Sequence, residues 1–258
     1  MIKLGMPIML GETLQNQAKL CKELGLQFIE LNSNFKEYLP NRLNDDELLK
    51  IAHEHNIYYT MHLDDHFSPC HIDDTIAHAH VQSVLASIRA AKRLSIPLLN
   101  IHIAKMAVVT LPSGPVSLFD VYEEDCTAGL IAFRQACETE IGDADIKICI
   151  ENYGGTHSSQ FMQKVLAILL ESHVFGLTFD IGHNAVSGFE DETIMMQYPE
   201  RVYHYHIHDV LDRKDHLPLG DGELDIMKYL DMASSAVLEV KTVEGLKKSK
   251  EWLDETSV

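Results

Sequence analysis

Short apolar runs alternate with longer segments of helical periodicity along the whole chain. The apolar runs have the length and the two-residue alternation of strands, whereas the segments between them repeat apolar positions every three or four residues. The predicted strands are Ile2–Met9, Phe28–Asn32, Tyr58–Leu63, Leu98–Ile103, Ile146–Tyr153, Gly176–Ile181, Val202–Asp209 and Ala236–Lys241. The predicted helices are Leu14–Leu24, Asp46–His55, Ile76–Leu94, Phe119–Thr139, Gln160–Glu171, Glu190–Gln197, Asp225–Tyr229 and Val243–Leu253.

Eight strands that alternate with helices predict an α/β fold, a (β/α)8 TIM barrel. No Pro-, Gly- or Ser-rich linker divides the chain, so we expect residues 1–258 to form a single domain. The stretch Val108–Val116 is interpreted as a loop inserted after the fourth strand. An open, doubly wound sheet is the competing architecture, because periodicity alone does not exclude it. The positions of the polar residues favour the closed barrel.

Polar residues gather near the carboxyl end of each predicted strand, on the face that alternation turns inward. Buried charges destabilise a barrel core by several kcal/mol unless they are paired or bound to a metal, and barrel enzymes collect their catalytic groups at this end. Carboxylates and imidazoles from several strands therefore predict a divalent metal site, for manganese, magnesium, cobalt or zinc. These residues are Glu30, Asn32, His62, His102, Glu151, Asp180, His206, Glu239 and Lys241, with His183 just beyond its strand.

Three histidines occupy alternate positions of one strand, His204, His206 and His208. A strand repeats every two residues, so their imidazoles share one face. We expect His206 to be the ligand, His204 to fill the core, and His208 to orient a ligand through a hydrogen bond.

Composition and charge disfavour several classes of partner and cofactor for this chain. The formal net charge of −18 disfavours nucleic acid as a partner, because a phosphate backbone is usually bound by a basic surface. No apolar run approaches the roughly 20 residues of a membrane helix, and the opening MIKLGMPIML is not typical of a secretion signal. Five cysteines without a CxxC pair predict reduced thiols and a cytoplasmic location. No P-loop or dinucleotide fingerprint is present, so no nucleotide cofactor is expected.

Five motifs in the second half of the chain resemble the xylose-isomerase-like TIM barrel superfamily. It includes sugar and sugar-phosphate isomerases and epimerases, and the related type-four apurinic endonucleases. The motifs are IENYG at Ile150–Gly154, DIGH at Asp180–His183, HIHD at His206–Asp209, HLPLGDGELD at His216–Asp225 and LEV at Leu238–Val240.

The epimerase-type site implies one divalent metal held by Glu151, Asp180, His206 and Glu239, with His183 on the substrate. The endonuclease-type site implies three zinc ions. It would add the ligands His62, His102, His183 and His216. That pattern also expects an aspartate two residues before His216, where this chain has Lys214.

The resemblance thus predicts an isomerase or epimerase of a ketose or sugar phosphate that works by proton transfer through a metal-bound enediolate. Glu151 and Glu239 are the expected catalytic residues. Substrate contacts are expected from His183, His62, His102, Lys105 and Arg213. Two alternatives stay open, a zinc-dependent phosphodiesterase like the apurinic endonucleases and a sugar-binding barrel without activity. The exact substrate, the metal and any association into homo-oligomers are left undetermined.

Overall fold

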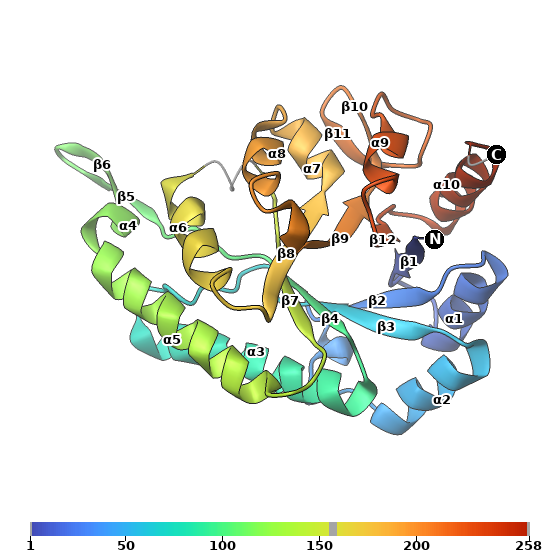
Figure 1. Cartoon of the computed structure of the whole chain (residues 1–258), viewed down its shortest axis with the longest axis horizontal. Helices are drawn as coiled ribbons and strands as arrows, with labels where there is room; N and C mark the ends of the chain where they lie inside the picture. The colour runs from blue at the N-terminus through green and yellow to red at the C-terminus, as the bar shows by residue number, and fades with distance from the viewer. Residues whose placement is uncertain (1, 155–158, 257–258) are drawn as a thin grey trace.

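The computed structural model describes residues 2–154 and 159–256. Within these ranges, eight parallel strands close into a barrel in the order β1-β12-β9-β8-β7-β4-β3-β2 (Figure 1). Pairing of β1 with β12 joins the first strand to the last. The barrel strands are β1 (Lys3–Pro7), β2 (Phe28–Asn32), β3 (Tyr58–His62), β4 (Leu98–Ile101), β7 (Lys147–Glu151), β8 (Phe175–Asp180), β9 (Val202–Ile207) and β12 (Ser235–Leu238).

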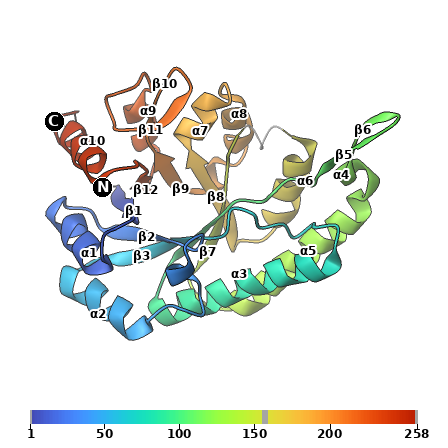
Figure 2. The ribbon, with the colours of Figure 1, turned by 180° about the vertical axis from the view of Figure 1, so that it is seen from behind.

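Helices surround the barrel, and α3 and α5 lie side by side along its outside (Figures 1 and 2). The helices are α1 (Leu14–Glu23), α2 (Asp45–His55), α3 (Asp74–Leu94), α4 (Leu118–Val121), α5 (Glu123–Ile141), α6 (Gln160–Leu169), α7 (Ile181–Val186), α8 (Glu190–Met195), α9 (Ile226–Leu230) and α10 (Val243–Thr256), with 3-10 turns η1 (Lys36–Tyr38) and η2 (Pro199–Arg201). The predicted (β/α)8 barrel is confirmed.

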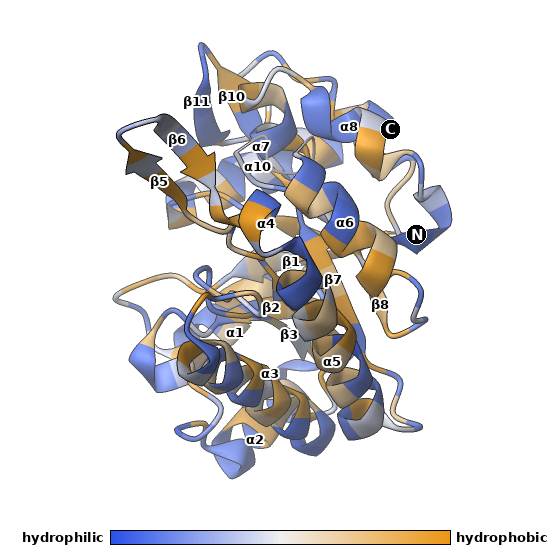
Figure 3. Cartoon of the chain, turned by 90° about the vertical axis from the view of Figure 1, so that its left-hand side faces the viewer, coloured by the Kyte–Doolittle hydropathy of each residue, from blue (hydrophilic) through white to orange (hydrophobic). Residues whose placement is uncertain are grey.

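Burial follows the periodicity of the sequence. Strands β7 and β8 are hydrophobic along most of their length, whereas helices such as α5 carry alternating hydrophobic and hydrophilic stripes (Figure 3). The apolar stripes pack on the strands and form one continuous core. At the start of α2, Asn44 accepts a hydrogen bond from the Glu47 amide, and acidic residues fill the first turn. The negative charges of these acidic residues are stabilised by the positive end of the helix dipole.

Two short ribbons and one helix differ from the sequence prediction. The expected loop at Val108–Val116 is an antiparallel hairpin of β5 (Val108–Leu111) and β6 (Gly114–Ser117), which projects from the barrel (Figure 1). A second ribbon, β10 (Asp209–Leu211) and β11 (Lys214–Leu217), follows β9. Helix α7 directly follows Asp180, in a stretch for which the periodicity predicts no helix. Each is only three to six residues long, which is too short to show a periodic signal.

The cysteine prediction is wrong for one pair. Cys70, in the loop after β3, and Cys126, on α5, form a disulfide across a sequence separation of 56 residues. Cys21, Cys137 and Cys149 are free and buried, and burial raises the pKa of Cys21 and Cys149 to about 12. In the described part of the chain, no helix combines the length and apolar character that a membrane span requires.

Candidate metal centre

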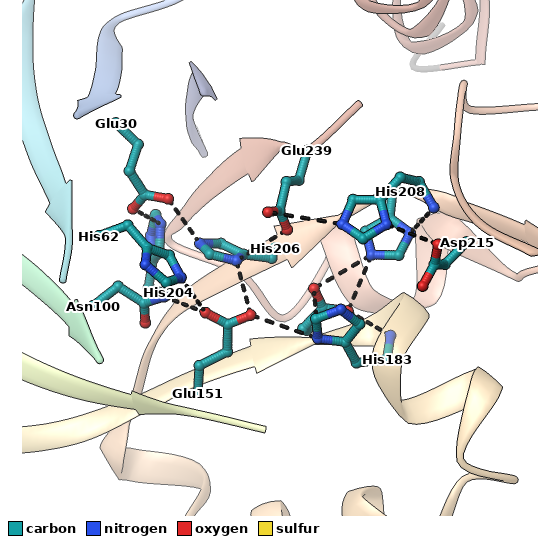
Figure 4. A network of polar contacts seen from close by, with 12 residues as sticks. Glu30, His62, Asn100, Glu151, His183, His204, His206, His208, Asp215 and Glu239 are labelled. Atoms are coloured by element: carbon teal, nitrogen blue, oxygen red, sulfur yellow. Dashed lines mark hydrogen bonds and ion pairs between the residues drawn. The ribbon is translucent and has the colours of Figure 1, made fainter. Parts of the chain in front are cut away.

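Four potential ligands meet at the carboxyl end of the barrel. Glu151 ends β7, Asp180 ends β8, His206 lies on β9, and Glu239 directly follows β12. One ligand atom from each lies within 4.8 Å of the others. Figure 4 shows Glu151, His206 and Glu239 pointing toward one another. The Glu239 amide donates to the carbonyl of Ile207, which extends the β9–β12 pairing and sets Glu239 beside His206. The predicted inward parity of these strands therefore brings the four residues together.

His206 is the centre of this group. Its Nδ1 atom lies 3.1 Å from Glu151 Oε1 and 3.2 Å from Glu239 Oε2. On the other side of the ring, its Nε2 atom lies 3.1 Å from Glu30 Oε1. The ring is fully buried, so both of its nitrogens face carboxylates with no access to solvent.

The second oxygen of Glu151 faces a separate set of groups. The Asn100 amide donates to Oε2, and the same oxygen lies 3.3 Å from His62 Nε2 and 3.2 Å from His102 Nε2. The Nδ1 atoms of these two histidines lie 3.6 Å and 3.5 Å from Asp65 Oδ1. Glu151 thus links the group around His206 to a second group of potential ligands, His62, Asp65 and His102.

Local contacts explain the DIGH motif. Asp180 caps α7 by accepting a hydrogen bond from the His183 amide at 2.6 Å, and its other oxygen lies 3.5 Å from His183 Nδ1. His208 Nε2 lies 3.2 Å from Asp180 Oδ1, so His208 contacts a candidate ligand as predicted. A Cβ atom at Gly182 would lie 1.9 Å from the His208 ring, so only glycine leaves room for this imidazole.

Partly exposed side chains form the accessible edge of the site. His183 and His216 are 19% and 18% exposed, and Glu239 is 24% exposed. The His216 ring stacks on His208, and its Nε2 atom lies 3.8 Å from Glu239 Oε1. These residues are the ones that a small molecule entering from solvent would meet.

Electrostatics at the site couple carboxylates to imidazoles. Burial would raise the pKa of Glu151 and Glu239, but the neighbouring His206, with His102 beside Glu151, outweighs it and holds both pKa values well below their usual range. Burial would lower the pKa of His206, but Glu151 and Glu239 outweigh that effect and raise it well above its usual value. Both carboxylates are therefore ionised near neutral pH.

The pKa values of the other histidines differ because their surroundings differ. Burial opposes protonation of His62 and His216, but contacts to Glu151 and to Glu239 raise the pKa of each to about 9. Burial lowers the pKa of His204 to about 4, and its Nδ1 atom lies 3.0 Å from the Ser235 hydroxyl. His204 is thus a neutral core residue, in line with the prediction.

The residues fit a divalent cation. Among the described residues, neither nitrogen of His206 nor Glu239 Oε2 has a hydrogen-bond partner of good geometry, although these atoms are buried and His206 Nδ1 faces Glu239 Oε2. Buried polar atoms are rarely left without a partner in native proteins. Three carboxylates and one imidazole are also a donor set suited to manganese, magnesium, cobalt or zinc.

A buried carboxylate fixes the loop after the site. Asp209 accepts hydrogen bonds from the backbone amides of Val210, Gly220, Gly222 and Leu224, at 2.8 to 3.1 Å. A Cβ atom at Gly222 would lie 2.2 Å from Asp209 Oδ1. The Gly-Asp-Gly sequence therefore serves to wrap backbone around this carboxylate.

Asp209→Asn should lower the free energy of unfolding by about 1.5–3 kcal/mol, because the amide nitrogen replaces an acceptor that two backbone donors use. Denaturant unfolding followed by circular dichroism measures the change. Asp221→Asn is the matched control, since Asp221 makes an exposed pair with Lys248 and should cost less than about 1 kcal/mol. Equal stability of the two variants would contradict the role given to Asp209.

The predicted cationic contacts make no ion pair with Glu151 among the described residues. Lys105 and Arg213 are exposed, and among the described residues neither belongs to the contacts around Glu151. Lys214 is also exposed, and Lys241 pairs with Asp215 while 67% exposed. Asn32 accepts a hydrogen bond from the Asn34 amide. Substrate contacts from Lys105 and Arg213 stay predictions.

Three neighbours of the site were not identified from the sequence. Asn100 binds Glu151, Asp65 contacts His62 and His102, and Asn152 exchanges two hydrogen bonds with the backbone of Asp180. Asn100 could have been found, because it has the same strand parity as His102. Asp65 and Asn152 lie after their strands, where parity gives no signal.

Comparison with known proteins places these features in context. The model of the family described as xylose isomerase-like TIM barrel matches residues 18–256. A search of curated protein sequences finds no match.

Solved structures with the same fold cover nearly the whole chain. A D-tagatose 3-epimerase-like protein has 21% identity and a TM-score of 0.75, over 98% of this chain and 96% of its own. The IolI protein with a bound zinc atom has 17% identity and a TM-score of 0.72, over 99% and 98%. The 3-keto-D-glucoside 4-epimerase YcjR from E. coli, in its apo form, has 13% identity and a TM-score of 0.73, over 99% and 98%.

Proposed function

The chain belongs to the xylose isomerase-like TIM barrel family, and on this premise we propose that it is a divalent-metal-dependent isomerase or epimerase of a ketose or sugar phosphate. The observation that carries the proposal is the group of Glu151, Asp180, His206 and Glu239 within 4.8 Å at the mouth of the barrel. The names of two structural neighbours, a D-tagatose 3-epimerase-like protein and a keto-glucoside epimerase, support the same class of substrate.

The four residues would hold the metal. A divalent cation bound there supplies Lewis acidity, which makes the proton on the carbon beside a ketose carbonyl easier to remove. Asp180 is held in place because it caps α7 and contacts His208. It would serve to hold the cation rather than to move a proton.

Glu151 and Glu239 would move the proton. They approach the site from β7 and from the end of β12, and both face Nδ1 of His206, so a molecule bound in front of that nitrogen would lie between them. Both are ionised near neutral pH, so one can accept a proton from the substrate at a carboxylate oxygen. The other carboxylate would pass a proton taken up from solvent to the opposite face of the same carbon, and the first would release its proton to solvent, so that no net proton is gained or lost.

Histidines would bind the substrate hydroxyls. His183 and His216 lie at the accessible edge, where burial opposes protonation but neighbouring carboxylates raise both pKa values, that of His216 to about 9. An imidazole N–H of either ring can donate a hydrogen bond to a hydroxyl oxygen. His62 and His102 line the side of Glu151 that faces β3 and β4. Exposed Lys105 and Arg213 would contact the substrate only at its outer end, where a sugar phosphate carries its charge.

The test is exchange of a substrate proton with solvent. The purified protein, loaded with manganese, is incubated with a panel of ketoses and ketose phosphates in deuterium oxide, and products are analysed by NMR. We expect one substrate to gain deuterium at the carbon next to the carbonyl as its epimer or isomer forms. Binding of ketoses without exchange in any of them would instead support a sugar-binding barrel without activity.

A second candidate is a zinc-dependent phosphodiesterase, and the extra histidines favour it. His62 and His102 share Glu151 with the first group, while His183, His208 and His216 form a further cluster. Against it stand Lys214, where the endonuclease pattern has an aspartate, and the net charge of −18. Incision of a DNA duplex with an abasic site by zinc-loaded protein would establish this function and overturn the isomerase proposal.

A further inference from the structure

Glu30 is a buried carboxylate that the proposed reaction does not use. It lies on β2, inside the barrel and on the far side of His206 from Glu151 and Glu239 (Figure 4). It is 3% exposed, and the Thr60 hydroxyl donates to its Oε2 atom at 3.2 Å. A carboxylate this deep in a barrel is costly unless specific contacts compensate for its charge.

The closest ring nitrogen to this carboxylate belongs to His206. Glu30 Oε1 lies 3.1 Å from His206 Nε2, whereas Glu30 Oε2 lies 3.8 Å from His204 Nε2. The opposite nitrogen of His206, Nδ1, faces the carboxylates of the proposed metal site. His206 thus lies between one carboxylate behind it and two in front of it.

The two nitrogens of a neutral imidazole are not equivalent. One carries the proton and the other a lone pair, and a carboxylate beside one nitrogen keeps the proton on that side. A metal ion bound at Nδ1 would replace the proton on that nitrogen, and the ring would keep its other proton on Nε2, which faces Glu30. Carboxylates behind metal-binding histidines commonly fix the ring in this way.

We propose that Glu30 is a positioning residue that holds His206 with its Nδ1 lone pair directed into the metal site. The proposal rests on the metal site of the proposed function, and it adds a group that touches neither metal nor substrate. It also accounts for the strand with three alternate histidines. His206 contacts the site, His208 contacts Asp180, and His204 fills the layer beside Glu30.

The competing explanation is that Glu30 only stabilises the fold. Two measurements distinguish the explanations. They are the metal affinity, from calorimetric titration with Mn2+, and the Tm of the metal-free protein. For Glu30→Gln, we expect Mn2+ affinity to fall by about 10–100-fold, because an uncharged amide oxygen holds the Nε2 proton less strongly than a carboxylate does. The metal-free Tm should shift no more than that of Thr60→Val, which removes a contact of the same carboxylate but leaves its charge.

Glu30→Asp is the conservative variant, since it keeps the carboxylate but shortens the side chain by one methylene group. Its Mn2+ affinity should lie between those of wild type and Glu30→Gln, and it supplies the test if Glu30→Gln does not fold. Visible spectra of the Co2+-loaded proteins give an independent signature, because a reoriented imidazole changes the bands of the bound cobalt.

The outcomes separate the two proposals. Mn2+ affinity of Glu30→Gln within threefold of wild type, with an unchanged Co2+ spectrum, overturns the positioning role and leaves the proposed function intact. Failure of the wild-type protein itself to bind Mn2+, Co2+ or Zn2+ overturns the proposed metal site and this inference with it.

Discussion

Replacing Glu151 or Glu239 by Gln will lower kcat for the identified ketose by about 10²–10⁴-fold, the range for loss of a general acid or base. The amide has nearly the same shape as the carboxylate but cannot accept a proton. The oxygens of Glu151 and Glu239 lie 3.1 and 3.2 Å from His206 Nδ1, so no other side chain occupies the position of either carboxylate. Steady-state kinetics of each single variant measure the effect.

Glu140→Gln is the matched control for these variants. Glu140 pairs with Arg89 on the outside of the barrel, so the kcat of the Glu140→Gln variant should equal that of the wild type. Metal content per chain must be measured in every variant, since Glu151 and Glu239 are also proposed ligands. Full activity in both single variants would sink the assignment of the two carboxylates as proton carriers.

Stripping the divalent metal with a chelator will reduce turnover to the background rate, and manganese returned after dialysis will restore it. We expect this loss because the cation held by Glu151, Asp180, His206 and Glu239 would supply the Lewis acidity that the proposed reaction needs. Added metal should also stabilise the fold, by about 2.7 kcal/mol at a metal concentration of 100 times Kd. Activity and Tm measured across a manganese titration test both effects.

The control for chelation adds the chelator together with an excess of manganese, which should leave turnover intact and so exclude inhibition by the chelator itself. Asp180→Asn should mimic metal removal, because it weakens a ligand that moves no proton in the proposed reaction. An enzyme that keeps its full rate after its metal content has fallen below a tenth per chain would contradict metal dependence.

Strand positions were the part of the fold that the sequence predicted best. Each of the eight predicted strands overlaps an observed one, and β2 has the predicted bounds, Phe28–Asn32. Alternation within a buried strand carries this signal, because each side chain faces either the helices or the barrel interior. The same alternation brought Glu151, Asp180, His206 and Glu239 together.

Features that depend on tertiary contact were missed for a physical reason. The ribbon of β10 and β11, which carries His216, has positive φ angles at Asp212, Arg213 and His216. These residue types do not predict that backbone conformation. The pairing of Cys70 with Cys126 arises because the loop after β3 lies against α5. Such contacts are set by the closed barrel and have no counterpart in the periodicity of either segment.

The role of Glu30 was also beyond sequence reasoning, although its inward position was predicted. Parity places a residue on a face, but it does not say at which depth the residue meets its neighbours. The position of Glu30 behind His206 depends on three strand pairings, β2 with β1, β1 with β12 and β12 with β9, which the sequence does not specify.

Closure of the barrel between β1 and β12 has a consequence for how the protein matures during synthesis. Glu239 follows the last strand, and that strand pairs with the first strand of the chain on one side and with β9 on the other. A nascent chain therefore already contains Glu151, Asp180 and His206 while the barrel is still open. Long-range pairing of this kind forms late in folding. We expect the growing chain to bind metal weakly until its final strand leaves the ribosome, so that assembly of the site and completion of the fold are the same event.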